Sequence, residues 1–198
     1  MEQVTVSVDL DGTLADFMTP ALTAVNLRFG SSYSYQDIIH HDAKTWMPSD
    51  HHDHFMEFVR DPEVYGRLDP LPEGIEVVLG LAERDCSIVI TSHRPPAALR
   101  PTRDWLLRHG VPYSQLSVSY GSKAALAEGY GPTRPLIFLD DDPSLVLALD
   151  LPREGIEVWL LKTPYTGSVG LDRCRVFPDW THLQAALFER LQPASVEL

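Results

Sequence analysis

Short apolar runs alternate with amphipathic stretches along most of the chain. Five runs of four to six residues have the apolar or alternating composition of strands, and each is followed by a segment with a helical pattern. The predicted strands are Val4–Asp9, Cys86–Thr91, Leu116–Ser119, Pro135–Leu139 and Ile156–Leu161. This alternation predicts a Rossmann-like α/β fold, with a parallel sheet of about five strands, right-handed crossovers and helices on both faces.

The alternation is interrupted after the first predicted strand. Residues 17–72 contain two helical patterns, Thr19–Phe29 and Ser49–Arg60, and no strand of comparable quality. About 55 residues are far more than a plain crossover connection needs. We therefore expect a small helical cap at residues 17–72, inserted into a core formed by residues 1–16 and 73–198.

Composition restricts the class of partner. Twenty-eight acidic residues against 16 basic ones give a formal net charge of −12. This disfavours a nucleic-acid polymer or an anionic membrane surface, because both require a basic patch. The chain has no run of 18 apolar residues and no basic, apolar leader, and its two cysteines form no CxxC pair. We expect a cytoplasmic monomer or homodimer that acts on a small molecule.

Polar residues with a capacity for phosphate chemistry follow the predicted strands in a fixed order. The four groups are Asp9 with Asp11, the run Thr91-Ser92-His93-Arg94, Lys123, and the run Asp140-Asp141-Asp142. The carboxyl ends of parallel strands meet at one edge of a sheet, where ligands bind in such folds. Gly12 allows a tight loop whose N–H groups can bind an anion. Two neighbouring carboxylates beside such a loop indicate a cation and a phosphate rather than a turn cap, because they would otherwise repel each other.

These groups would support hydrolysis of a phosphomonoester through an aspartyl-phosphate. Asp9 would attack phosphorus, and Asp11 would protonate the leaving oxygen and then accept a proton from the hydrolytic water. Thr91, Ser92 and Lys123 would bind the phosphoryl oxygens.

The same edge predicts a magnesium site. Mg²⁺ prefers an octahedron of oxygen ligands. The predicted ligands are Asp9, Asp11 through its carbonyl, Asp140 and Asp141. Asp142 precedes Pro143 and would cap the next helix instead. The histidine-rich run DHHDH (residues 50–54) lacks the ligand arrangement of a zinc site and is interpreted as a solvated helix start.

The segment Val4–Phe17, VTVSVDLDGTLADF, resembles the first motif of the haloacid dehalogenase superfamily, DxDG[TV]. In the terms of that superfamily, Thr91 matches the second motif, Lys123 the third, and the run LDDD the fourth. Within it, the chain is most similar to the 5'(3')-deoxyribonucleotidases, of the cytosolic and mitochondrial pyrimidine type, and to their bacterial and phage relatives. The likeness rests on DLDGTLADF, a helical insertion of similar length, Arg60–Leu81, TSHRP, and KTPYT at Lys162–Thr166.

The resemblance implies a Mg²⁺-dependent 5'-nucleotidase, with deoxyribonucleoside monophosphates favoured as substrates. It implies that Phe17, the aromatic residue after the first motif, packs on the nucleobase. Arg94 would pair with the phosphate or the ribose. Two alternatives remain open: Phe17 packs between cap and core, and Arg94 pairs with a carboxylate of the cap. The Thr-Ser-His-Arg motif departs from the animal enzymes, which leaves base preference open. The sequence also does not distinguish ribose from deoxyribose or a 5' from a 3' phosphate.

Two other functions fit the same motifs. One is hydrolysis of a different small phosphorylated metabolite by the same fold. The other is a catalytically silent binding protein, which is disfavoured because Asp9, Asp11 and Lys123 are all present.

Overall fold

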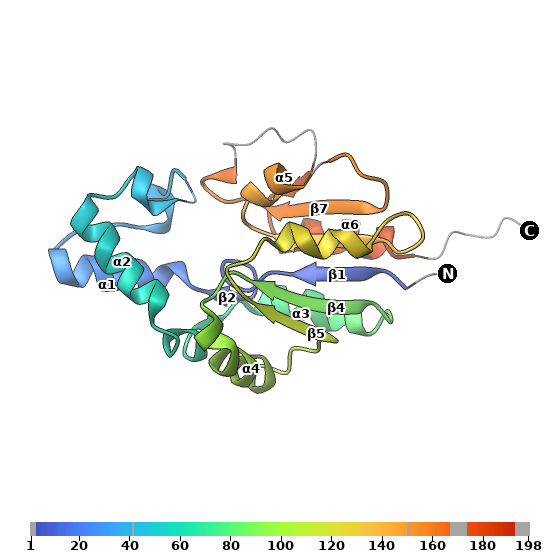
Figure 1. Ribbon diagram of the computed structural model, residues 1–198, viewed down its shortest axis with the longest axis horizontal. Coiled ribbons are helices and arrows are strands. Elements are labelled where there is room, and N and C mark those ends of the chain that lie inside the picture. Colours follow the sequence, from blue (N-terminus) through green and yellow to red (C-terminus); the bar gives the residue numbers. More distant parts are fainter. Residues whose placement is uncertain (1–2, 41, 150, 167–173, 193–198) are drawn as a thin grey trace, which may run out of the picture.

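The computed structural model describes residues 3–40, 42–149, 151–166 and 174–192. Its centre is a six-stranded sheet in the order β5-β4-β1-β6-β7-β8, and every neighbouring pair of strands is parallel (Figure 1). The strands are β1 (Thr5–Val8), β4 (Ser87–Ser92), β5 (Gln115–Val118), β6 (Leu136–Asp140), β7 (Ile156–Leu161) and β8 (Arg175–Phe177). The Rossmann-like fold class is confirmed.

The sheet contains the five strands located from the sequence and one more. All five predicted strands are present, with ends that differ by no more than one or two residues, and β8 is the additional one. Its three residues include only one that is fully buried, Phe177. So short a segment carries no hydrophobic pattern that distinguishes it from a loop.

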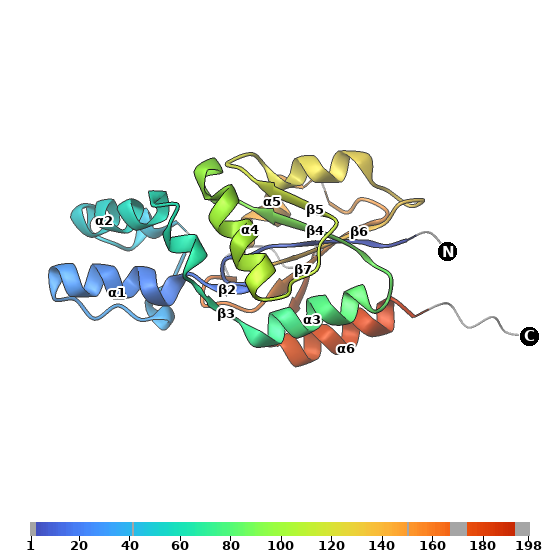
Figure 2. The same cartoon turned by 90° about the horizontal axis from the view of Figure 1, so that it is seen from below.

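The sheet is covered on both faces, which explains why β6 is buried at every position. Alternate residues of a strand face opposite sides: Ile137 and Leu139 join the core cluster that includes β1 and β4, whereas Leu136 and Phe138 join a second cluster. Helices α3 (Pro72–Ala82) and α6 (Trp180–Arg190) lie side by side over one face (Figure 2). Helix α5 (Ser144–Ala148) and the 3-10 helix η5 (Lys123–Gly129) cover the second cluster. Helix α4 (Leu99–Arg108) connects β4 to β5.

The segment between β2 (Ala15–Asp16) and β3 (Asp69–Pro70) is helical and lies beyond the carboxyl ends of the sheet strands (Figures 1 and 2). Strands β2 and β3 pair antiparallel and form a two-stranded link between this segment and the sheet. Its elements are α1 (Met18–Phe29), η1 (Tyr35–Asp37), η2 (Ala43–Thr45), α2 (Ser49–Arg60) and η3 (Val64–Gly66). We keep residues 17–72 as the proposed cap, and the term "cap" below means this segment.

Helices α1 and α2 pack against each other within the cap. Helix α1 ends at Phe29, and Gly30 terminates it with a left-handed φ of 65° and an N–H that donates to the Asn26 carbonyl. The ring of Phe29 stacks on His51 with centroids 4.2 Å apart. Across the described residues, no helix combines the length and hydropathy needed to cross a membrane.

Candidate active site

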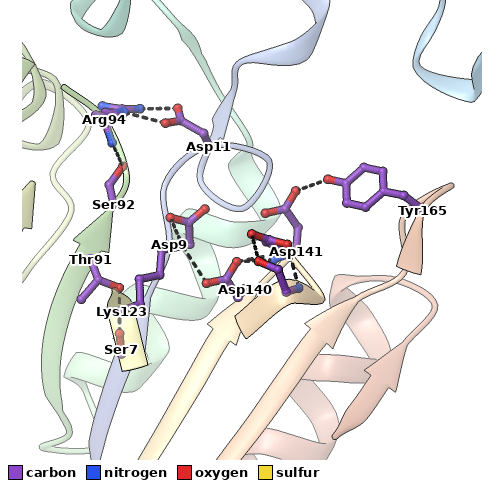
Figure 3. Close-up of polar contacts among 12 residues, drawn as sticks. Ser7, Asp9, Asp11, Thr91, Ser92, Arg94, Lys123, Asp140, Asp141 and Tyr165 are labelled. Carbon is purple, nitrogen blue, oxygen red and sulfur yellow. Dashed lines mark hydrogen bonds and ion pairs between the residues drawn. The ribbon is translucent and has the colours of Figure 1, made fainter. Parts of the chain in front are cut away.

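Four polar segments meet at the carboxyl edge of the sheet, as the order of the motifs predicted (Figure 3). Asp9 directly follows β1, and its N–H donates to the Leu139 carbonyl of β6 at 3.0 Å. Thr91 and Ser92 end β4, and Asp140 ends β6. Because β1 lies between β4 and β6, the ends of all three strands are adjacent.

Asp9, Asp140 and Asp141 form a buried group of carboxylates. Each side chain offers an oxygen within 4.8 Å of the others, and each residue is less than 8% exposed. Lys123, at the start of η5, places its Nζ 2.7 Å from Asp9 Oδ1 and 2.7 Å from Asp140 Oδ2. The other oxygen of Asp140 accepts the N–H groups of Asp141 and Asp142, both at 3.0 Å. We call these four residues, Asp9, Lys123, Asp140 and Asp141, the acidic cluster.

One ammonium group does not balance three buried carboxylates. Burial, followed by the charges of Asp140 and Asp11, raises the pKa of Asp9 to about 7 although Lys123 opposes the shift. Burial, with Asp9 and Asp140, also raises the pKa of Asp141. Burial by itself would lower the pKa of Lys123, but Asp140 and Asp9 together outweigh it and raise that pKa. Full ionisation of the three carboxylates is therefore unfavourable in this environment, and they tend either to keep protons or to require a further positive charge.

The donor set fits a hard divalent cation such as Mg²⁺, which prefers carboxylate oxygens. A cation here would neutralise the excess charge that burial makes unfavourable. Among the described residues, no other group of three or more His, Cys, Asp or Glu side chains has ligand atoms this close together.

The loop after β1 depends on Gly12. Its φ is 84°, and a Cβ atom at this position would lie 2.3 Å from Oδ2 of Asp141. Both the left-handed backbone and the contact with the acidic cluster therefore require glycine. The Gly12 N–H itself donates to the Ala15 carbonyl at 2.9 Å, and the prediction that N–H groups of this loop bind an anion stays a prediction.

Asp11 turns away from the acidic cluster and pairs with Arg94. Nε and Nη2 of Arg94 donate to the two carboxylate oxygens at 2.8 and 2.7 Å, and Nη1 donates to Thr102 Oγ1 at 3.0 Å. The Arg94 side chain is fully buried, and its guanidinium carbon lies 4.7 Å from the centre of the Tyr65 ring. The alternative that Arg94 pairs with a cap carboxylate is wrong, since its partner belongs to the β1 loop.

Of the predicted phosphate-binding residues, Lys123 belongs to the acidic cluster, and Thr91 and Ser92 lie near it at the end of β4. The buried hydroxyl of Thr91 is 2.9 Å from that of Ser7 on β1, and Ser92 Oγ accepts the Arg94 N–H at 3.3 Å. A cavity of about 280 Å³ is lined by Thr91, Ser92 and Lys123, together with hydroxyl groups of the segment that follows β5. The structure thus brings the three residues to one cavity.

Phe17, the first residue of the cap, lies in an aromatic group formed by cap residues. Its ring stacks on Tyr65 with centroids 5.8 Å apart and an interplanar angle of 12°. It also meets Phe55 and Phe58 edge to face, at 6.2 and 5.6 Å. Phe17 is 9% exposed, so most of its ring surface is used in packing. Its predicted role as a platform for a nucleobase stays a prediction.

Comparison with known proteins identifies the family. Residues 2–130 match the family model "5' nucleotidase, deoxy (Pyrimidine), cytosolic type C protein", which covers more than half of the chain. The chain belongs to this family of nucleotidases. The resemblance inferred from the DLDGT motif is therefore confirmed.

Two curated relatives come from Staphylococcus epidermidis, strains RP62A and ATCC 12228. Both bear the name "Putative 5'(3')-deoxyribonucleotidase" and are 26% identical to this nucleotidase-family chain over 110 residues. The match covers 55% of this chain and 61% of each relative, so it spans about three fifths of their length.

Solved structures with the same fold cover almost the whole chain. A HAD family hydrolase from Deinococcus radiodurans R1, with bound phosphate and sodium, has a TM-score of 0.63 at 18% identity, covering 97% of this chain and 99% of that one. A D,D-heptose 1.7-bisphosphate phosphatase from B. bronchiseptica, complexed with magnesium and phosphate, has a TM-score of 0.55 at 16% identity, with 96% and 99% covered. At these identities the likeness establishes the haloacid dehalogenase fold of this family member and nothing further.

Sequence reasoning missed two tyrosines near the acidic cluster. Tyr165 donates its hydroxyl to Oδ2 of Asp141 (Figure 3). Tyr35 of η1 interacts with both Tyr165 and Asp141. Tyr165 follows β7 within the segment KTPYT, and its position just beyond a strand end was the available signal. No pattern in the cap sequence pointed to Tyr35.

Proposed function

We propose that the protein is a Mg²⁺-dependent phosphomonoester hydrolase that acts on nucleoside 5'-monophosphates, with deoxyribonucleotides favoured. The observation that carries the proposal is the buried carboxylate of Asp9, held 2.7 Å from Lys123 beside Asp140 and Asp141, in a chain of the nucleotidase family. We further propose a cytoplasmic monomer or homodimer, whose partner is a small phosphorylated molecule.

In the proposed mechanism Asp9 is the nucleophile. One of its oxygens attacks phosphorus, and the bond from phosphorus to the nucleoside oxygen breaks. Lys123 would bind phosphoryl oxygens once Asp9 is engaged, with Thr91 and Ser92 donating from the end of β4. Water then attacks the aspartyl-phosphate, which releases phosphate and regenerates the Asp9 carboxylate.

Asp11 would move the protons. It would donate a proton to the leaving oxygen in the first step and take one from water in the second. Both of its oxygens accept hydrogen bonds from Arg94 at 2.7–2.8 Å. Proton transfer therefore requires at least one of these two hydrogen bonds to give way.

Asp9, Asp140, Asp141 and the Asp11 carbonyl would hold Mg²⁺. When bound, the cation would supply the positive charge that lets an anionic phosphate approach an anionic nucleophile. The fit rests on the three close carboxylates, whose ionisation is unfavourable without a further positive charge, and on their oxygen donors.

A second candidate is hydrolysis of another small phosphate ester. The burial of Phe17 favours it, because a ring that is 9% exposed offers little surface for stacking on a base. The experiment that separates the two is a phosphate-release screen with Mg²⁺ over ribo- and deoxyribonucleoside 5'- and 3'-monophosphates and over sugar phosphates. Nucleotides should be hydrolysed with the highest kcat/KM. Faster hydrolysis of a sugar phosphate than of every nucleotide would contradict the nucleotidase proposal.

A further inference from the structure

Asp141 is held by a tyrosine that the proposed mechanism does not use. Tyr165 is 6% exposed and donates its hydroxyl to Asp141 Oδ2 (Figure 3). The turn that carries it is fixed by its neighbours: Thr166 Oγ1 accepts the Thr163 N–H at 2.7 Å and lies 2.6 Å from Thr163 Oγ1. A buried hydroxyl on a hydrogen-bonded turn is suited to orienting one carboxylate oxygen.

A second tyrosine reaches the same place from the cap. Tyr35 opens η1, a turn in which the Asp37 carboxylate accepts the N–H and hydroxyl of Ser34 at 2.8 and 2.7 Å. The hydroxyl of Tyr35 lies near that of Tyr165 and influences it electrostatically, as does the carboxylate of Asp141. Burial and then the nearby charge of Asp141 raise the pKa of Tyr35 to about 12, which agrees with a neutral phenol at this position.

The same oxygen of Asp141 also lies against the loop after β1. Oδ2 of Asp141 lies where a side chain at position 12 would begin, so the Gly12 loop packs directly against it. The Asp141 N–H donates to Asp140 Oδ1 at 3.0 Å. These contacts restrict how the Asp141 carboxylate can rotate, so the hydrogen bond from Tyr165 is the contact that can change its orientation. Tyr165 itself contacts the cap at a point separate from the β2–β3 link.

We propose that Tyr165 is a positioning residue that orients Asp141 for the metal, and that Tyr35 couples this orientation to the position of the cap. The inference rests on the proposed function, because it needs Asp141 to be a metal ligand. Linkage is reciprocal, so a cap that favours the oriented carboxylate strengthens Mg²⁺ binding, and bound Mg²⁺ favours the same cap position.

The test measures Mg²⁺ binding without substrate. Melting temperatures of wild type, Tyr165→Phe, Tyr35→Phe and the double variant, recorded over a series of Mg²⁺ concentrations, give the affinity of each by mass action. We expect Tyr165→Phe to weaken Mg²⁺ binding by about tenfold, the lower end for loss of a group that orients a ligand. Tyr35→Phe should weaken binding less. The double variant should match Tyr165→Phe alone, because Tyr35 acts through Tyr165.

Tyr113→Phe is the matched control, since Tyr113 is 37% exposed, as Tyr35 is, and takes no part in the acidic cluster. It should bind Mg²⁺ as the wild type does. Unchanged affinity in Tyr165→Phe would overturn the positioning role. A Tyr35 effect that persists in full in the Tyr165→Phe background would overturn the coupling. If the wild type itself shows no Mg²⁺-dependent shift, the metal site of the proposed function fails, and this inference fails with it.

Discussion

Asp9 and Asp11 are separated by one residue, yet they occupy different surroundings. Asp9 belongs to the acidic cluster and pairs with Lys123, whereas Asp11 pairs with Arg94. Two carboxylates in distinct environments are suited to two distinct chemical roles. This division supports Asp9 as the nucleophile and Asp11 as the residue that transfers protons.

We predict that Asp9→Asn abolishes turnover and leaves the fold intact. The amide cannot form an acyl phosphate, while Lys123 keeps its partner Asp140 at 2.7 Å. Phosphate release and circular dichroism measure the two effects. Asp142→Asn is the matched control, because its carboxylate bonds to Ser144 rather than to the acidic cluster. Steady-state hydrolysis by purified Asp9→Asn would remove Asp9 from the nucleophile role.

Arg94→Lys should lower kcat with little change in KM. Lysine keeps the charge but loses the two-pronged contact at 2.8 and 2.7 Å that orients Asp11. The loss should be larger for a natural nucleotide than for a nitrophenyl ester, whose leaving group needs no proton. Steady-state kinetics with both substrates provide the comparison. Equal losses for both would mean that Arg94 contacts the phosphate or the sugar rather than acting through Asp11.

The strand-end residues of the site were predictable, but their partners were not. Asp9, Thr91, Lys123 and Asp140 follow apolar segments, so a parallel sheet necessarily brings them to one edge. The Arg94–Asp11 pair joins residues 83 positions apart, and no spacing rule specifies it. The Tyr165–Asp141 bond depends equally on tertiary packing.

The loop between β1 and β2 shows how backbone conformation determines the site. Gly12 and Gly30 both have a left-handed backbone, with φ of 84° and 65°. They differ in their surroundings: a Cβ at Gly12 would collide with Asp141, while one at Gly30 would meet no atom within 4 Å. Substitutions at the two glycines therefore distinguish the cost of a left-handed backbone from the cost of a steric clash.

Gly30→Ala should destabilise the protein by about 1 kcal/mol, the cost of a left-handed conformation for a residue with a Cβ. Gly12→Ala should cost more and should also weaken Mg²⁺ binding, because Asp141 must move. Urea denaturation and Mg²⁺-dependent melting measure both effects. Equal destabilisation of the two variants with unchanged Mg²⁺ binding would show that the loop accommodates the methyl group.

Phe17→Ala should destabilise the protein strongly, by about 3–5 kcal/mol, as expected for truncation of a buried aromatic ring. The ring contacts three other aromatic residues of the cap. If it also stacks on a base, kcat/KM on nucleotides should fall by about one to two orders of magnitude more than on a nitrophenyl ester. Equal losses on both substrates would leave Phe17 with a packing role alone.

The elements that escaped prediction are those too short for a periodic pattern. Strands β2 and β3 have two residues each and are defined by their pairing with each other. Lys123 begins η5, which is a 3-10 helix. The motif around Lys123 does not indicate which type of helix follows. The long helices α1 and α2 were predicted within one residue at each end, because their apolar faces and stop signals are local.

Across the whole molecule, excess negative charge and metal binding are linked. The chain has a formal net charge of −12, and its most buried acidic residues lie in one cluster. An uncompensated buried charge opposes folding. A cation bound only by the folded state stabilises that state. The free energy of unfolding of the metal-free protein should consequently fall as pH rises. An ordinary salt-bridged carboxylate has the opposite effect, because it makes the folded protein more stable as pH rises.

We predict that the metal-free protein loses stability as pH rises from about 4 to about 7. The pKa of Asp9 is raised from 3.8 to about 7 in the folded state, so folding favours its protonated form. The stability that this provides is full below pH 3.8 and is lost as pH rises through about 7. Asp9→Asn removes this dependence, so in chelator its melting temperature should rise relative to that of wild type across the interval. Excess Mg²⁺ at pH 7.5 should raise the melting temperature of the wild type more than that of Asp9→Asn, because the variant binds the cation less well. A constant difference between the two proteins from pH 4 to 8 would show that Asp9 is ionised throughout and that Lys123 alone compensates its charge.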